Sequence, residues 1–358
     1  MNSPHRLSVL QHRDPELETC AYCPKLCRAA CPVADVEASD TLTPWGQMRA
    51  VFDMARGAIE PSPEFAALSY ACTSCRNCRE SCDHRNPVPE TLFEARALHL
   101  QRGHAPLAVQ RFHARFAARL ESVRTKLDEL RRVHAHDDRA GTALLAGCDY
   151  TLHLDAELDD GVRAARALFG PLRLISGCCG MPLDAAGDPE GARALRAEVA
   201  REVKGARRVV ALDAGCAFAL SSLGAVPFAR AAEDVLAAAP ARPPSGRRGT
   251  LRYHDPCFLA RGIGETSAPR ALIERVTGAA PAEFSRRGNR TRCSGGGALL
   301  PIARPETRAR IAADRVHEHE RLGGGTIVTA CAASLRSLRA AGASVVDLMT
   351  IVRELSRP

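Results

Sequence analysis

The chain has 358 residues, of which 46% are hydrophobic and 25% charged, and its net charge is +8. This length and composition are ordinary for a globular protein with two or three cores, and no stretch is apolar for long enough to span a bilayer. The positive charge comes almost wholly from arginine and forms no basic stripe interleaved with aromatic residues, so we expect no nucleic-acid partner. An acidic protein partner or an anionic membrane surface is compatible with it.

Fifteen cysteines are the unusual feature of the composition. An odd number cannot pair off completely in disulfides, and the first residues, MNSPHRLSVLQHRDPELET, lack the apolar run of a secretory signal. We therefore expect a reducing, cytoplasmic location, in which clustered thiols are typical metal ligands. A peripheral position at the inner face of the membrane stays open.

Eight of the cysteines lie within residues 15–95, in two runs of four. Spacings of two or three residues let one loop supply three thiolates to a [4Fe–4S] cube, and in two-cluster ferredoxins the last cysteine of each run crosses to the other cluster. Zinc is the alternative metal, although zinc sites usually stop at two cysteines per knuckle. The predicted ligands are Cys20, Cys23, Cys27 and Cys82 for cluster 1, and Cys72, Cys75, Cys78 and Cys31 for cluster 2.

Residues 96–140 contain no cysteine, and we predict a linker helix there. Apolar residues from Val109 to Leu130 recur three or four positions apart and form one stripe, as on a single long helix. The other faces carry several arginines and a lysine. They form either a solvated surface or a docking surface for a partner or membrane.

Residues 141–358 alternate short β-rich runs with helical patterns. A helix is expected to begin at Pro189, because Asp188 before it is a suitable N-cap. Strands that alternate with helices indicate a largely parallel α/β arrangement. The predicted strands are TALLAG, LRLIS, RRVVAL, TLRYH, TIVTA and SVVDL.

The seven remaining cysteines form a repeated pattern in this part of the chain. Each half has a lone cysteine, then a doublet position followed by glycine, then a final cysteine after a β-rich run. The doublet and the final cysteine are 38 residues apart in both halves, which indicates an internal duplication. The cysteines are Cys148, Cys178, Cys179 and Cys216 in the first half, and Cys257, Cys293 and Cys331 in the second.

This pattern resembles the cysteine-rich "CCG" domain, which occurs in heterodisulfide reductase B and D subunits. It also occurs in the iron–sulfur subunits of glycolate oxidase, anaerobic glycerol-3-phosphate dehydrogenase and lactate-utilisation systems. The resemblance covers residues 15–95 and 141–350, and the motif from His254 to Cys257 matches the family's second repeat closely. It implies an α+β multidomain fold, with a small α-helical two-cluster ferredoxin module followed by a duplicated α/β cysteine-rich domain. We expect the module in 1–95, the linker helix in 96–140, and the CCG repeats in 141–245 and 246–358.

The sequence departs from the family pattern, in which a full repeat has five cysteines. Ala219 and Ser334 stand where the last cysteine of each repeat is expected, and Ser294 replaces the second cysteine of one doublet. Repeat one keeps the four thiols that a cubane needs, a candidate cluster 3. Repeat two keeps three, which leaves an incomplete site, a site completed by an oxygen or by His254, or no site with the thiols as packing residues.

The resemblance implies an iron–sulfur electron-transfer subunit with two [4Fe–4S] clusters and, as an option, a third in the CCG repeats. It would pass electrons between a flavoprotein dehydrogenase partner and a quinone or other carrier. The alternative is a catalytic thiol/disulfide reductase, like the heterodisulfide reductases. A redox- or iron-sensing regulator or a structural zinc protein is a third reading, and no recognisable DNA-binding segment supports the regulator. No catalytic residue is predicted.

Overall fold

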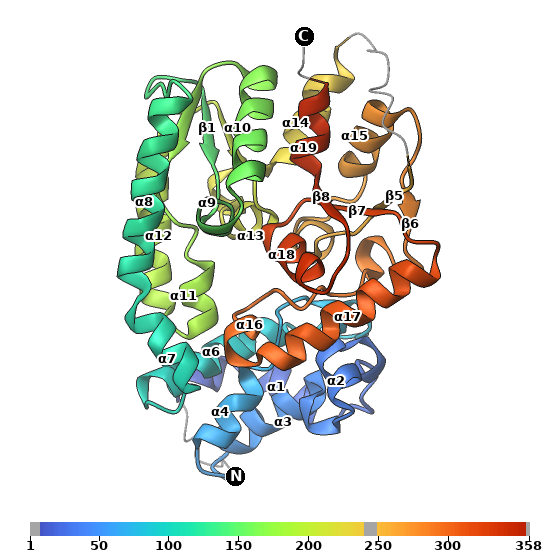
Figure 1. Cartoon of the computed structure of the whole chain (residues 1–358). Helices are drawn as coiled ribbons and strands as arrows, with labels where there is room; N and C mark the ends of the chain where they lie inside the picture. The colour runs from blue at the N-terminus through green and yellow to red at the C-terminus, as the bar shows by residue number, and fades with distance from the viewer. Residues whose placement is uncertain (1–7, 240–248, 356–358) are drawn as a thin grey trace. The chain divides into compact units, whose positions relative to one another are not determined.

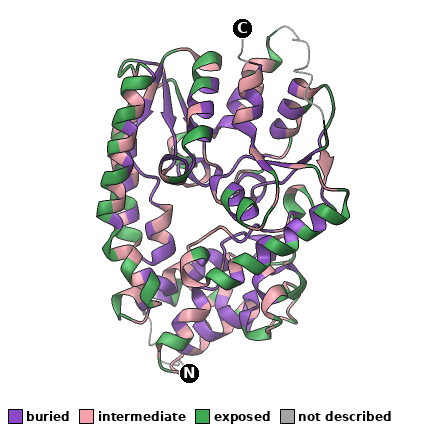
Figure 2. Cartoon of the chain, in the orientation of Figure 1, coloured by how far each residue is buried: buried purple, intermediate pink, exposed green. Residues whose placement is uncertain are grey.

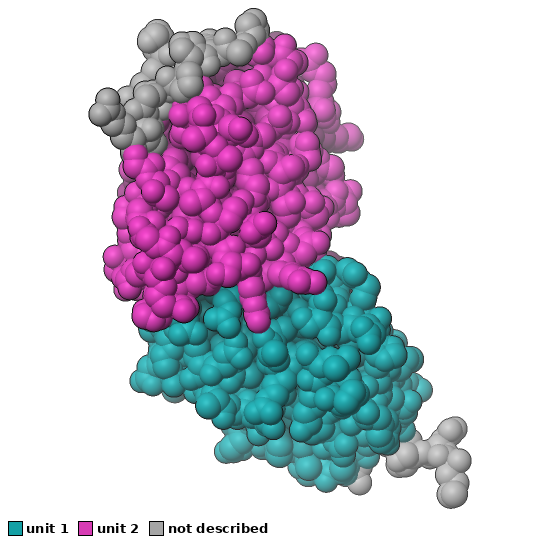
Figure 3. All heavy atoms as spheres, turned by 90° about the vertical axis from the view of Figure 1, so that its right-hand side faces the viewer, with its two compact units in different colours: residues 1–115, 182–192, 292–314 teal, residues 116–181, 193–291, 315–358 magenta. Residues whose placement is uncertain are grey.

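The computed structural model describes residues 8–239 and 249–355 (Figure 1). The repeat boundary expected at residue 245 lies outside these ranges. The described chain divides into two compact units (Figure 3). Unit 1 comprises residues 1–115, 182–192 and 292–314, and unit 2 comprises residues 116–181, 193–291 and 315–358.

Unit 1 is helical, and proline starts three of its first four helices. Pro32, Pro44 and Pro63 occupy first-turn positions, where the missing N–H costs no hydrogen bond. Thr43 caps one of these helices, because its hydroxyl accepts a hydrogen bond from the Gly46 amide at 3.1 Å. The helices are α1 (Asp14–Ala21), α2 (Pro32–Glu37), α3 (Pro44–Ala55), α4 (Pro63–Ser69), α5 (Asn77–Glu80), α6 (Val88–Gln101), α7 (Leu107–Ala114) and α16 (Leu300–Ala303).

The single linker helix expected from the apolar stripe is wrong. The helix is interrupted at Arg115, which separates α7 from α8 (Phe116–Val133). The two helices belong to different compact units. The stripe itself is real, since Val109, Val123 and Leu127 are buried. The periodicity of the apolar residues does not reveal this interruption, because the four-residue spacing from Phe112 to Phe116 continues across it.

Unit 2 contains two four-stranded sheets in which every pairing is parallel. Their strand orders are β2-β1-β3-β4 and β6-β5-β7-β8, so both repeats have the same topology. The strands are mostly buried (Figure 2), as expected for parallel sheets covered by helices. They are β1 (Thr142–Leu145), β2 (Leu172–Ile175), β3 (Arg208–Ala211), β4 (Ala225–Pro227), β5 (Leu251–Tyr253), β6 (Ala282–Glu283), β7 (Thr326–Thr329) and β8 (Val345–Asp347).

Helices connect these strands, and four of them pack the two repeats of unit 2 together: α10 and α14 from repeat one, α15 and α19 from repeat two. Three other helices, α11, α12 and α17, cross the boundary between the units in sequence. The helices are α9 (Cys148–His153), α10 (Asp155–Phe169), α11 (Met181–Ala186), α12 (Pro189–Glu202), α13 (Ala214–Ala219), α14 (Phe228–Ala237), α15 (Ala268–Thr277), α17 (Pro305–Arg321), α18 (Ala332–Ala340) and α19 (Leu348–Glu354).

The predicted fold class is confirmed: a helical N-terminal part precedes two α/β repeats with parallel sheets. All six predicted strands are present, and so is the helix at Pro189, where the Asp188 carboxylate accepts from the Gly191 amide. The strands β4 and β6, of three and two residues, were not predicted. In the described ranges, no helix is both long and apolar enough to cross a membrane.

A buried hydrogen bond links the two repeats inside unit 2. The Tyr150 hydroxyl donates to the Asp347 carboxyl at 2.5 Å, and the other oxygen of Asp347 caps α19 by accepting from the Met349 amide. Burial raises the pKa of Asp347 to about 7, against the opposing effect of the Tyr150 hydrogen bond. The folded protein therefore keeps this carboxyl protonated at a pH where the unfolded chain has released the proton.

This difference predicts a pH dependence of stability. Between about pH 4, the usual pKa of an aspartic acid, and about pH 7, the unfolded state loses the proton first, so raising the pH favours unfolding. In Asp347→Asn this contribution is absent. Thermal melts of both proteins across this range should show the Tm of the wild type falling relative to that of the variant as the pH rises. A Tm difference independent of pH would contradict the assignment.

Candidate functional site

The eight N-terminal cysteines lie on short loops and helix ends of unit 1. Cys20 lies in the last turn of α1, Cys31 precedes α2, and Cys78 lies in α5. In the second run the chain turns sharply around Cys75, because Ser74 and Arg76 both have left-handed backbone angles. The tight loops therefore direct several thiols inward from one short stretch of chain.

One cavity in unit 1 brings the predicted ligands of cluster 1 together. Its volume is about 400 Å³, and aromatic side chains also line it. The Asn86 amide donates to Cys20 Sγ at 3.0 Å. Burial raises the pKa of Cys20 to about 12, and the nearby thiols Cys27, Cys82 and Cys23 add to this effect. Its cysteines are Cys20, Cys23, Cys27, Cys78 and Cys82.

A second and much smaller cavity in unit 1, of about 20 Å³, brings the predicted ligands of cluster 2 together. Burial raises the pKa of Cys31, and its thiol neighbours are Cys75 and Cys72, from the other run. The Ser74 amide donates to Cys72 Sγ at 3.3 Å. Cys78 lines both cavities, but the largest contributions to its raised pKa after burial come from Cys75, Cys72 and Cys31.

These two sets have the donor chemistry of metal-cluster ligands. A buried thiol resists ionisation, and four together resist it more, because each thiolate would repel the others. Cationic iron offsets both effects, and thiols from both cysteine runs line each cavity. In the described ranges, no three His, Cys, Asp or Glu side chains are arranged to hold a single metal ion. The residues present therefore fit a [4Fe–4S] cluster in each cavity, and the ligand assignment stays a prediction.

The four cysteines of repeat one also meet in one small cavity of unit 2, of about 10 Å³. Each follows the carboxyl end of one of three adjacent strands, where sites form in parallel sheets. Their sulfurs form a chain of contacts from Cys148 to Cys178, then Cys179, then Cys216. The Cys179 and Cys216 sulfurs are only 3.3 Å apart.

Repeat two distributes its three cysteines differently. Cys257 and Cys331 belong to unit 2, and Cys293 belongs to unit 1. Burial raises the pKa of Cys331, and a hydrogen bond from Ser334 opposes this. The turn after Cys293 matches the turn after Cys178. The Gly295 amide donates to Cys293 Sγ at 3.3 Å, and the Gly180 amide donates to Cys178 Sγ at 3.4 Å. Both glycines have positive φ, which explains why glycine follows the doublet in each repeat.

His254 was one candidate to complete the site of repeat two, and its ring is already engaged. Arg315 Nε donates to His254 Nδ1 at 3.3 Å, so the proton of the neutral ring lies on Nε2. Burial, Arg315 and Arg261 lower the pKa of His254, which keeps the ring neutral. In this arrangement neither ring nitrogen offers a free lone pair to a metal.

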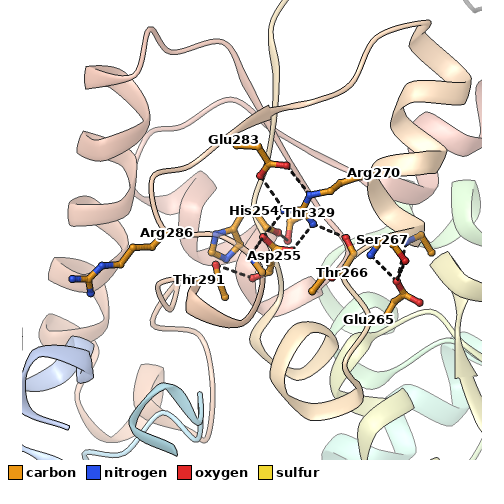
Figure 4. Close-up of polar contacts among 12 residues, drawn as sticks. His254, Asp255, Glu265, Thr266, Ser267, Arg270, Glu283, Arg286, Thr291 and Thr329 are labelled. Atoms are coloured by element: carbon orange, nitrogen blue, oxygen red, sulfur yellow. Dashed lines mark hydrogen bonds and ion pairs between the residues drawn. The ribbon is translucent and has the colours of Figure 1, made fainter. Parts of the chain in front are cut away.

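The neighbouring Asp255 belongs to a structural network (Figure 4). Arg270 donates to both oxygens of Asp255 and to both oxygens of Glu283, and the Gly288 amide also donates to Asp255. Nearby, Glu265 accepts from the amides of Ser267 and Ala268 at the start of α15. The motif from His254 to Cys257 thus anchors the loops of repeat two.

Two polar side chains at these sites were missed as functional residues by sequence reasoning. Asn86 follows Cys82 by only four positions, but nothing in the sequence says which sulfur its amide reaches. Asp213 accepts from the amides of Gly215 and Cys216 in α13 and of Ala332 in α18. It therefore joins two cysteine-bearing elements of unit 2. The feature of the sequence that could have identified Asp213 is that it is a single charged residue inside an apolar run.

The match of these cavities to two crossed ligand sets predicts a specific mutational pattern. Cys31→Ser should remove the same cluster as Cys75→Ser, and Cys82→Ser the same cluster as Cys23→Ser, because each pair lines one cavity. Iron content and the low-temperature EPR spectrum of each reduced variant, purified without oxygen, measure this. If Cys82→Ser instead removed the signal lost in Cys75→Ser, the ligand sets would not cross.

Comparison with known proteins agrees with this organisation. Residues 16–86 match the 4Fe-4S dicluster domain, and residues 146–221 and 251–338 match the cysteine-rich (CCG) domain. The B subunit of the fumarate reductase (CoM/CoB) of Methanothermobacter marburgensis is 23% identical over 73% of this chain and 55% of its own length. The D subunit of the dihydromethanophenazine:CoB–CoM heterodisulfide reductase of Methanosarcina barkeri is 25% identical over 79% of this chain and 76% of its own.

A probable membrane-anchored ferredoxin of Chromohalobacter salexigens is 37% identical over 24% of this chain and 13% of its own length. The chain spans about half the length of the fumarate reductase protein that it matches. The similarity to both reductase proteins extends over about three quarters of the chain, so it is not confined to the dicluster domain.

Proposed function

We propose that this chain, an iron–sulfur protein that joins a 4Fe-4S dicluster domain to two CCG domains, is the electron-transfer subunit of an oxidoreductase complex. It would pass electrons between a flavin-dependent dehydrogenase on another chain and a quinone or other carrier. The observation that carries this proposal is the pair of cavities in unit 1, each lined by at least four thiols from two cysteine runs.

The chemistry of electron transfer would come from the bound clusters, each of which exchanges one electron at a time. The chain's own residues would hold the clusters and set their environment. Cys20 and Cys72 receive N–H hydrogen bonds from Asn86 and Ser74, and N–H donors to cluster sulfurs raise a reduction potential. Apolar residues such as Val33 and Val88 border the second cavity and limit the access of water.

The relatives support a role as a subunit, because two of them are named as subunits of reductases. A partner that supplies or removes electrons is therefore part of the proposal. Peripheral association with a membrane is proposed only on the similarity of the dicluster part to a probable membrane-anchored ferredoxin.

A second candidate function, disulfide reduction, rests on repeat one. All four of its thiols line one cavity, so a third cluster could be held there by Cys148, Cys178, Cys179 and Cys216. One relative is named as a subunit of a heterodisulfide reductase. The fifth cysteine of a full family repeat is absent, because Ala219 occupies its position.

Electron throughput distinguishes a carrier from a scaffold. Reduced methyl viologen should pass electrons through the wild-type protein to a water-soluble quinone, and Cys23→Ser or Cys75→Ser should lower this rate at least about tenfold, because each removes one cluster from the path. Ser81→Ala is a matched control, since this exposed residue lies next to Cys82 and lines neither cavity. Unchanged rates in both cysteine variants would refute the proposal.

The second candidate makes a separate prediction. If repeat one is a catalytic site, the protein should reduce a small disulfide with viologen as the electron donor, and Cys216→Ser should abolish this while the EPR signals of the dicluster domain remain. If the wild type reduces no disulfide, repeat one is not a disulfide reductase. Disulfide reduction that survives in Cys216→Ser would place the activity elsewhere in the chain.

A further inference from the structure

Arg96 is a fully buried cation in α6 of unit 1. Its guanidinium donates hydrogen bonds to main-chain carbonyl oxygens. Nε and Nη2 donate to Ser69 O at 3.1 and 2.7 Å, and Nη2 also donates to Cys72 O at 2.9 Å. Nη1 donates to Ala185 O at 2.8 Å and to Ala298 O at 3.1 Å. Among the described residues, no carboxylate pairs with this guanidinium.

Two aromatic rings complete the surroundings of Arg96. Its guanidinium carbon lies 4.8 Å from the ring centre of Tyr70 and 4.7 Å from that of Phe93. Burial lowers the pKa of Arg96 to about 10, which still leaves the group charged at neutral pH. A positive charge is therefore held out of water without an anionic side chain beside it.

Two other buried arginines in the described chain pair with carboxylates, whereas Arg252 also donates to main-chain carbonyls. Arg315 donates to Glu318 at 2.7 Å, and Arg76 donates to Glu90 at 2.6 Å. A buried ion without a counterion is costly, and such groups are normally paired or bound to a metal site. Carbonyl oxygens solvate Arg96 but carry no net charge, so they leave its full positive charge in place. The missing counterion is the feature that needs an explanation.

The predicted cluster 2 is a site of negative charge beside Arg96. Arg96 binds the carbonyl oxygen of Cys72, one of the cluster's predicted ligands. Cys20 in the cluster 1 cavity has a neutral hydrogen-bond donor, Asn86, and its largest charge contributions come from other thiols.

We propose that Arg96 is the countercharge of the cluster held by Cys31, Cys72, Cys75 and Cys78, and that it raises the reduction potential of this cluster above that of cluster 1. The proposal rests on the proposed ligand sets. One electron from the donor adds one negative charge to this four-thiolate site, and no bond is made or broken. A fixed cation in a dry environment stabilises the reduced site more than the oxidised site.

The position of Arg96 also indicates the direction in which electrons would flow within unit 1. The carbonyls of Ala185 and Ala298 belong to segments that follow the cysteine doublets of repeats one and two. The second of these segments approaches the cluster 2 loop closely, since a Cβ at Gly297 would lie 2.4 Å from Thr73 O. Electrons that enter at cluster 1 would move downhill to cluster 2, beside the segments that lead to the CCG repeats.

The test is a redox titration followed by EPR, on full-length protein purified without oxygen. The variants Cys31→Ser and Cys82→Ser first assign the two signals. Arg96→Gln should then lower the reduction equilibrium constant of cluster 2 at least about tenfold, which is 59 mV for a one-electron couple, and leave cluster 1 unchanged. The difference should persist at high salt, because a buried charge is poorly screened.

Two further variants distinguish an effect of the positive charge of Arg96 from an effect of the hydrogen bonds around it. Arg96→Lys keeps the charge and loses the fork of hydrogen bonds, so cluster 2 should load fully and keep its wild-type potential. Tyr70→Phe removes the hydroxyl that donates to Ala186 O at 2.8 Å and leaves the charge intact, so it too should leave the potential unchanged.

Several results would overturn the proposal. Equal potentials in wild type and Arg96→Gln, with full iron content in both, would show that the charge has no effect. A loss of iron or a lowered potential in Arg96→Lys would show that cluster 2 depends on the fork of hydrogen bonds and not on the charge. This test remains decisive even if Arg96→Gln fails to bind clusters. Absence of clusters from the wild type itself would instead contradict the proposed function.

Discussion

Four thiols buried around one cavity cannot all ionise unless a cation lies among them, and the N-terminal part of the chain is organised around this constraint twice. Burial and neighbouring thiols raise the pKa of Cys20 to about 12 and also raise that of Cys78. Iron would offset this cost, because each thiol that binds it releases its proton and becomes a thiolate ligand. Each cavity needs thiols from both cysteine runs, so cluster binding and the packing of the two runs would stabilise one another.

A different physical rule places the cysteines of the C-terminal part. In parallel sheets, the loops after the strands all leave from the same edge, so residues that follow neighbouring strands meet there. Cys148, Cys178 and Cys216 follow the strands β1, β2 and β3 in this way. Repeat two has the same strand order, and the turns at Gly180 and Gly295 are equivalent. The duplication therefore extends from the cysteine spacing to the topology of the sheets.

Much of this organisation is predictable from the sequence, because cysteine spacing and β-rich runs are local signals. The two cysteine runs, six of the eight strands and the helix at Pro189 all follow from short windows of sequence, whereas the crossed ligand sets stay a prediction. The break at Arg115 was not predictable, because the apolar spacing continues through it. Nor was the packing of residues 182–192 and 292–314 into unit 1, since it depends on contacts between segments far apart in the chain. In the sequence, Arg96 does not differ from other arginines on predicted helices, and its complete burial is visible only in the structure.

The central claim is that both cavities of unit 1 hold [4Fe–4S] clusters, and metal analysis tests it most directly. Iron and acid-labile sulfide should be measured on protein purified without oxygen, together with the low-temperature EPR spectrum after reduction. We predict about eight irons and eight sulfides per chain with two interacting cubane signals, or about twelve of each if repeat one is also loaded. Zinc without sulfide, or a single cluster with about four irons, would contradict the account.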